Sequence, residues 1–157
     1  GVGSFDWAIS RLNASGFRAI LDDLVIHKKI PVLGVCVGMQ IMASSSEEGV
    51  SPGLGWIPGS VRSMRTLDNQ NIVLPHMGWN SLDIYSHQLF TGIDDPSFYF
   101  LHSYHFVPDL LSHSIASVSY DNTFCAAIAN GNIFGVQFHP EKSHFSGVTL
   151  LRNFAAL

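Results

Sequence analysis

A cysteine flanked by glycines is the first feature of the sequence that could carry out chemistry. Gly34 and Gly38 lie two positions either side of Cys36 in the run GVCVG, directly after a short apolar segment. The same spacing around serine forms the nucleophile elbow of the α/β-hydrolases, a strained turn between a strand and a helix. We expect both glycines to be required, because a side chain would not fit close to such a turn.

An elbow at this position would also activate the cysteine. The helix dipole would favour the thiolate of Cys36 over the thiol, and the N–H of Val37 would point to where an oxyanion forms. The alternative is a buried structural cysteine in a glycine-rich turn. Cys125 illustrates that alternative, since its neighbours FCAA predict a small core residue on a strand.

A histidine followed by Pro-Glu is the best candidate for the base that this nucleophile needs. His139 ends the apolar segment IFGVQF, so it should lie at the carboxyl end of a buried strand, where α/β proteins place their sites. Pro140 stiffens the turn, and Glu141 can then fold back to hold the imidazole by its second nitrogen. A strand-end histidine beside an unrelated surface carboxylate is the alternative, and the cysteine elbow makes it the weaker one.

The other histidines and the overall composition exclude several classes of function. His102 and His105 are three apart on a predicted strand, hence on opposite faces, and no HExxH or CxxC spacing occurs, so we expect no metal and no cofactor. The net charge of -4 without a Lys/Arg cluster excludes a nucleic-acid partner. No apolar run reaches the ~20 residues of a membrane span. The start of the chain lacks a signal-peptide pattern, which predicts a cytoplasmic protein with free thiols.

The pattern of apolar residues predicts alternating helices and strands. Helices are expected over 5–12, 16–29, 38–49 and 146–155, and strands over 30–35, 54–64, 71–84, 97–107, 114–121, 124–131 and 132–141. Helix, strand, tight turn and helix in succession predict an α/β fold with a parallel sheet, in one domain over 1–157. Because Gly1-Val2-Gly3-Ser4 is a turn with no strand before it, we expect an opening strand-helix-strand unit to be missing.

These motifs together resemble a known family. LGVCVGMQ and FGVQFHPEKS are similar to the class I, triad-type glutamine amidotransferases. GVGSF, SSEEG, GLGWIPGSV, LPHMGWNSL and FYFLHSYHF resemble, more narrowly, the glutaminase subunit of imidazole glycerol phosphate synthase. The resemblance covers nearly the whole chain. It implies a flavodoxin-like open sheet, mainly parallel with added antiparallel strands, and it supports the missing N-terminal unit.

The resemblance implies a role for each matching residue. Cys36 would attack the carboxamide of L-glutamine, His139 would move the proton, and Glu141 would fix the imidazole tautomer. The oxyanion hole would be formed by backbone N–H groups of Val37 and of the Gly1-Val2-Gly3 loop. The substrate's amino-acid end would be held by Gln40, Ser103 and Tyr104. For Gln40 alone, a solvated helix residue is the alternative.

The resemblance also implies a partner. Family members form a heterodimer with a (β/α)8-barrel synthase, which receives ammonia through a channel and makes imidazole glycerol phosphate and AICAR in histidine biosynthesis. Its docking surface would include Met77, Trp79, Tyr99 and Lys142, although core packing explains Trp79 and Tyr99 equally well. Three other functions stay open: serving a surface-polysaccharide amidotransferase, a truncated binding-only paralogue, and, as the weakest, a cysteine peptidase.

Overall fold

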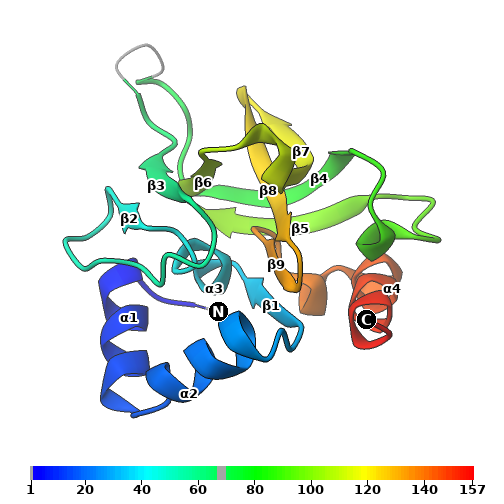
Figure 1. Ribbon diagram of the computed structural model, residues 1–157. Helices are drawn as coiled ribbons and strands as arrows, with labels where there is room; N and C mark the ends of the chain where they lie inside the picture. Colours follow the sequence, from blue (N-terminus) through cyan, green and yellow to red (C-terminus); the bar gives the residue numbers. More distant parts are fainter. Residues whose placement is uncertain (1, 67–69) are drawn as a thin grey trace.

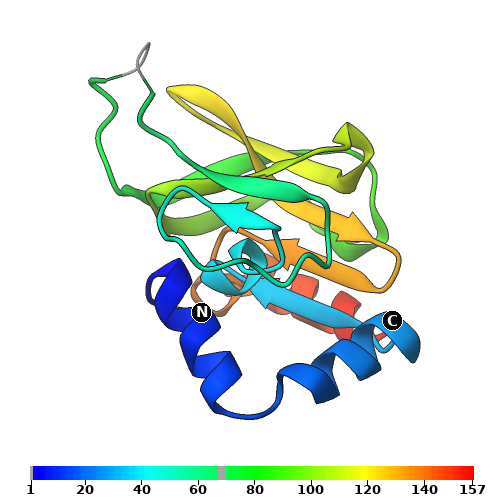
Figure 2. The same cartoon turned by 60° about the vertical axis from the view of Figure 1, so that its left-hand side comes forward.

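The structure is a computed structural model that describes residues 2–66 and 70–157. A six-stranded sheet has the order β1-β9-β8-β7-β4-β5, and a three-stranded sheet has the order β2-β3-β6. Helices α1, α2 and α4 lie below strands β4, β5, β7 and β8 in both views (Figure 1, Figure 2). The α/β class expected from the sequence is confirmed.

Each segment that the apolar pattern predicted as a strand contains one, and β2 alone among the described strands lies in a segment predicted as a helix. Their bounds are β1 Val32–Val35, β2 Ser45–Ser46, β3 Gly59–Ser63, β4 His76–Ile84, β5 Ser97–His102, β6 Tyr104–Pro108, β7 Ser114–Tyr120, β8 Asn122–Asn130 and β9 Ile133–Val136. The predicted turns at Asp121 and Gly131 are present, and both residues have positive φ, 64° and 60°. The predicted segments 54–64 and 71–84 each contain one strand and the loop before it, whereas 97–107 contains two strands, β5 and β6, that belong to different sheets.

The large sheet is mixed, with more antiparallel pairs than the mainly parallel sheet that was expected. Only β1 with β9 and β2 with β3 pair in parallel among the strands of the described ranges. The other described pairs are antiparallel. For β7, β8 and β9 the cause is the connection: tight turns at Asp121 and at residues 131–132 join them in succession, and a tight turn can connect only antiparallel neighbours.

The helices agree with the sequence except for one. The α-helices are α1 Phe5–Ala14, α2 Arg18–Asp22, α3 Val37–Gln40 and α4 His144–Ala155; α2 continues as the π-helix Asp23–His27, and 3-10 turns occupy Gln88–Phe90, Leu111–His113 and Pro140–Lys142. The prediction of a helix over 38–49 is wrong, since α3 ends at Gln40.

The chain leaves α3 because its next residues pair with a strand. Ser44 N donates to Gly59 O at 2.9 Å, and Ser45 and Ser46 form β2 beside β3. Gly49, expected as a helix stop, packs instead against the Asp6 carboxylate, which accepts from the amides of Val50 and Ser51. The polar run after α3 therefore forms a loop tied to the start of α1.

Two apolar cores pack on the two faces of the large sheet. Neighbouring residues of one strand contribute to different cores: Phe134 belongs to the one with Phe98 and Phe138, and Ile133 to the one with Phe5. Successive strand side chains point to opposite faces, so this alternation shows that both faces of β9 are covered. The end of β9 is consequently held rigidly, and the candidate site begins there.

Candidate active site

Cys36 lies in the strained turn that its flanking glycines predicted. It follows β1 directly and has φ 53° and ψ -115°, a combination that non-glycine residues rarely adopt. This strained turn positions the side chain of Cys36 at the N-terminus of α3. Gly34 is required, because a Cβ there would lie 2.5 Å from Gly38 O. The matching expectation for Gly38 is wrong: among the described atoms, a Cβ at Gly38 meets nothing within 4 Å.

The parallel pair β1 and β9 brings the two candidate catalytic segments together. Val35 pairs with Val136, and Cys36 N donates to Val136 O at 2.8 Å. The chain that leaves the carboxyl end of β9 therefore starts beside Cys36. It carries Gln137 and then His139, so residues about a hundred positions apart meet at one sheet edge, as α/β folds commonly arrange them.

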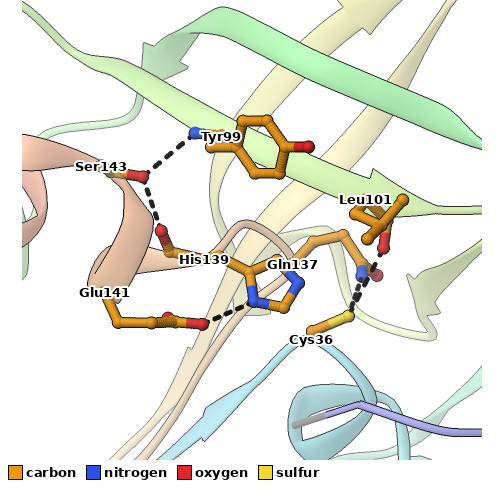
Figure 3. Close-up of polar contacts among 7 residues, drawn as sticks. All are labelled: Cys36, Tyr99, Leu101, Gln137, His139, Glu141 and Ser143. Atoms are coloured by element: carbon orange, nitrogen blue, oxygen red, sulfur yellow. Dashed lines mark hydrogen bonds and ion pairs between the residues drawn. The ribbon is translucent and has the colours of Figure 1, made fainter.

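His139 lies between Glu141 and Cys36 (Figure 3). Its Nδ1 lies 2.7 Å from Glu141 Oε1, and the ring is only 2% exposed. Nδ1 carries the proton in this pair because a carboxylate can only accept. Nε2 has no hydrogen-bond partner among the described residues, and in Figure 3 it lies on the side of the ring toward Gln137 and Cys36. In the tautomer with the proton on Nδ1, Nε2 therefore presents a lone pair to the nucleophile's side of the site.

The carboxylate of Glu141 is suited to this orienting role. Burial raises its pKa, but the hydrogen bond from His139 and local backbone donors outweigh burial, so the pKa lies below its ordinary value. Glu141 stays ionised at neutral pH as a result. It can fix the tautomer of His139 and stabilise an imidazolium.

The backbone of His139 is clamped by Ser143 and β5. His139 N donates to Tyr99 O at 2.8 Å, while Ser143 Oγ donates to His139 O at 2.6 Å and accepts from Tyr99 N at 3.0 Å. Ser143 is 1% exposed, so water cannot replace these bonds. The sequence analysis assigned no role to Ser143, although its place at the end of the FGVQFHPEKS motif, four residues after His139, could have indicated one.

The thiol of Cys36 is protonated at neutral pH, contrary to the expected thiolate. Burial raises its pKa, although the adjacent Val37 amide partly offsets this. A four-residue helix such as α3 has a weak dipole, so burial dominates. The thiol can donate to Leu101 O at 3.8 Å, and no hydrogen bond joins its Sγ to Nε2 of His139. A base is therefore needed to activate it. For Cys125, burial raises the pKa to about 11, as befits a structural thiol.

A cavity of about 180 Å³ opens beside Cys36 and gathers most of the residues expected to bind substrate. It is lined by Gly3, Cys36, Val37, Gln40, Glu48, Leu101, His102, Ser103 and Tyr104. Val2, by contrast, is 72% exposed and does not line this cavity, and Gly1 lies outside the described residues. Sequence reasoning missed Glu48, which comes from the loop after α3 and accepts from Phe5 N at 2.8 Å.

Gln40 is a buried residue, so the interpretation of it as a solvated helix residue is wrong. It is 5% exposed, and its Nε2 donates to Tyr104 O at 2.9 Å and to Gln137 Oε1 at 3.0 Å. These bonds join α3 to the Ser103-Tyr104 wall of the cavity. Gln137 was also missed, because in the sequence it is one polar residue in an apolar strand.

A buried histidine pair supports the same wall from behind. His102 Nδ1 lies 2.8 Å from Tyr104 O, and its Nε2 lies 2.9 Å from Nδ1 of His76, which is fully buried. Burial lowers the pKa of His102 to about 3, so it is neutral. His105 lines a different cavity from His102, and among residues 2–66 and 70–157 no group of three or more His, Cys, Asp or Glu could hold a metal.

The four residues expected at a partner surface lie close together. Met77 and Trp79 on β4 are 63% and 47% exposed, Tyr99 on β5 is half-buried and pairs with Trp79, and Lys142 is exposed. The ammonium of Lys142 lies 5.4 Å from the centre of the Tyr99 ring, and His144 stacks on Trp79 with ring centroids 5.1 Å apart. Core packing does not explain Trp79.

In the described part of the chain, no helix is both long and apolar enough to cross a bilayer.

Comparison with known proteins agrees with this geometry. The family described as "Glutamine amidotransferase class-I" matches residues 13–156. Imidazole glycerol phosphate synthase subunit HisH of Bdellovibrio bacteriovorus is 54% identical over 160 residues, which cover 100% of this chain and 78% of that protein. The protein of the same name from Leptospira interrogans is 52% identical with the same coverage.

Solved structures share the fold at low identity. A putative GMP synthase protein from Thermoplasma acidophilum superposes with a TM-score of 0.65 at 20% identity, covering 97% of this chain and 66% of that one. A glutamine amidotransferase from Thermotoga maritima superposes with a TM-score of 0.61 at 18% identity, covering 99% and 59%. The family match over most of the chain and the relatives above half identity lead to one conclusion: this chain belongs to the class I glutamine amidotransferases.

Proposed function

We propose that the chain is a glutaminase subunit that hydrolyses L-glutamine to glutamate and ammonia through Cys36, His139 and Glu141. The observation that carries this proposal is the pairing of β1 with β9, which sets a strained cysteine beside a buried histidine whose Nδ1 is held by a carboxylate. Its Nε2 has no hydrogen-bond partner among the described residues, so it is available to act as the general base.

The reaction follows from these groups in two halves. Nε2 of His139 takes the thiol proton as Sγ of Cys36 attacks the carboxamide carbon, and the carbonyl oxygen becomes an oxyanion facing the N–H of Val37 and the Gly3 segment. The C–N bond then breaks and His139 protonates the leaving ammonia, which leaves a γ-glutamyl thioester. Water attacks the thioester while His139 takes its proton, the C–S bond breaks, and the proton returns to Cys36.

The lining of the cavity suits glutamine as the substrate. Its size of about 180 Å³ suits one small polar molecule, and its lining includes Ser103, Tyr104, Glu48 and Gln40. Glu48 supplies a negative charge for the α-ammonium group of an amino acid. These features support the assignment of Gln40, Ser103 and Tyr104 as substrate-binding residues.

We also propose that the ammonia passes to a (β/α)8-barrel synthase bound in a heterodimer, which makes imidazole glycerol phosphate and AICAR. Both relatives described above are named as subunits of imidazole glycerol phosphate synthase, which favours this acceptor over a surface sugar. The exposed Met77 and Trp79, with Lys142 above Tyr99, would form the docking surface, because aromatic and Met side chains are enriched at interfaces.

Glutamate and ammonia release with and without a candidate barrel synthase tests this function. We expect release that the synthase stimulates, that Cys36→Ala abolishes, and that Cys125→Ala leaves intact. A folded chain that shows no release with any synthase would refute the glutaminase and leave the binding-only alternative. Release stimulated only by a sugar amidotransferase would refute the histidine-pathway acceptor.

A further inference from the structure

Gln137 places its amide group between the nucleophile and the cavity wall. Its side chain is fully buried, its Nε2 lies 3.7 Å from Sγ of Cys36, and its Oε1 accepts from Gln40 Nε2 at 3.0 Å (Figure 3 shows the contact with Cys36). Its backbone is fixed too, since Gln137 N donates to Ala126 O at 2.8 Å. A buried polar group held on both sides is preorganised, and it needs no rearrangement when charge develops nearby.

The neighbours of Gln137 decide which end of its amide faces the sulfur. Gln40 Nε2 also donates to Tyr104 O, a carbonyl that can only accept, so the NH2 end of Gln40 points toward Gln137. Gln137 must then present Oε1 to Gln40 and NH2 to Cys36. The sulfur of Cys36 therefore has a fixed N–H donor on its buried side.

We propose that Gln137 is a further catalytic residue, whose N–H stabilises the Cys36 thiolate once the thiol proton has been removed. This inference rests on the proposed glutaminase function and adds a residue to it. Burial disfavours the thiolate, so a donor already in place offsets part of that penalty. The same amide ties the nucleophile to Gln40 and thus to the wall that would hold glutamine.

The pH dependence of Cys36 alkylation by iodoacetamide tests the contact directly, because only the thiolate reacts. The full chain would be used with Cys125→Ser as background, and modification would be followed by intact mass. Gln137→Met removes the donor at similar size. Gln137→Glu keeps the acceptor for Gln40 but replaces the donor with a negative charge. Gln88→Glu is the charge control, because Gln88 is an exposed residue at the start of the 3-10 turn Gln88–Phe90 and does not line the cavity.

We expect the alkylation midpoint to rise by about one pH unit in Gln137→Met, roughly a tenfold lower rate at fixed pH, and by more in Gln137→Glu. Gln88→Glu should match the background. Thermal unfolding would establish that each variant is folded. Superimposed profiles for a folded Gln137→Met and the background would overturn the proposal even if glutamine hydrolysis is present. Shifted profiles without any hydrolysis would uphold the contact and count against the glutaminase function instead.

Discussion

Replacing Gly34 with alanine tests the geometry of the elbow most sharply, because Gly38 in the same motif is a built-in control. A Cβ on Gly34 would lie 2.5 Å from Gly38 O, 2.6 Å from Gly38 C and 2.7 Å from Met39 N. All three are backbone atoms of α3, which cannot rotate away as a side chain can. The start of α3 would have to move by roughly 1 Å to restore ordinary contacts, and overpacking of this kind costs about 1–3 kcal/mol.

The same shift would move Cys36 relative to His139. A displacement of about 1 Å in a catalytic group can lower the rate about 100-fold. Gly38→Ala has no such contact among the described atoms, and in a helix it should be neutral or stabilise the fold by about 0.5–1 kcal/mol. Urea unfolding followed by tryptophan fluorescence would give the two stabilities, and glutamate release would give the rates. Equal stability and equal activity of the two variants would refute this account of the elbow.

Three further predictions concern the nucleophile, the clamp and the titration of the thiol. The unfolding free energy of Cys36→Gly should exceed that of Cys36→Ala by about 1–2 kcal/mol, because glycine accepts the positive φ without strain; equal unfolding free energies would contradict stored strain. Ser143→Ala should lower the free energy of unfolding by about 1–3 kcal/mol and lower kcat more than it raises KM, because it frees the backbone of His139. The control Ser146→Ala loses one exposed hydrogen bond and should lower the free energy of unfolding by less. The reverse order of the two variants would contradict the clamp. The alkylation midpoint of wild-type Cys36 should lie above the ordinary thiol pKa of about 8.5, because burial raises the pKa of this thiol. The raised pKa stabilises the folded state below about pH 8.5, and this stabilisation is lost as the pH rises through the pKa of Cys36 in the folded state. A midpoint at or below about 8.5 would contradict burial of the thiol.

The sequence allowed the elements around the site to be predicted because their signals are local. Alternating apolar residues indicated the strands, and the apolar run before Cys36 gave β1 within two residues. The prediction of a helix over 38–49 was wrong because Ser44 and the β2 residues bind β3 instead. Such a tertiary contact overrides local propensity and produces no periodic pattern in the sequence. The largely antiparallel pairing was not predicted, because the sequence of a single strand does not reveal which strand it pairs with.

The candidate site was predictable where function requires a motif and unpredictable where it requires only a contact. Cys36, His139 and Glu141 have distinctive neighbours in the sequence. Gln137 and Ser143 lie in the FGVQFHPEKS motif and His102 in FYFLHSYHF, but their residue types and positions indicate no role, because each makes a hydrogen bond to a partner that only the fold reveals. The protonation state of Cys36 was likewise mispredicted, because it depends on two features that only the fold reveals. The burial of the thiol depends on the whole cavity wall, and the length of α3 depends on the strand that follows it.

Trapping the covalent intermediate tests the central claim most directly. The chain, with its synthase partner present, would be mixed with glutamine, quenched in acid within the first turnovers, and analysed by intact mass and peptide mapping. We predict a γ-glutamyl adduct on Cys36 and none on Cys125, with the adduct absent from Cys36→Ala and strongly reduced in His139→Ala. Glutamate release by Cys36→Ala at the wild-type rate, or an adduct on any other residue, would contradict the assignment of Cys36 as the nucleophile.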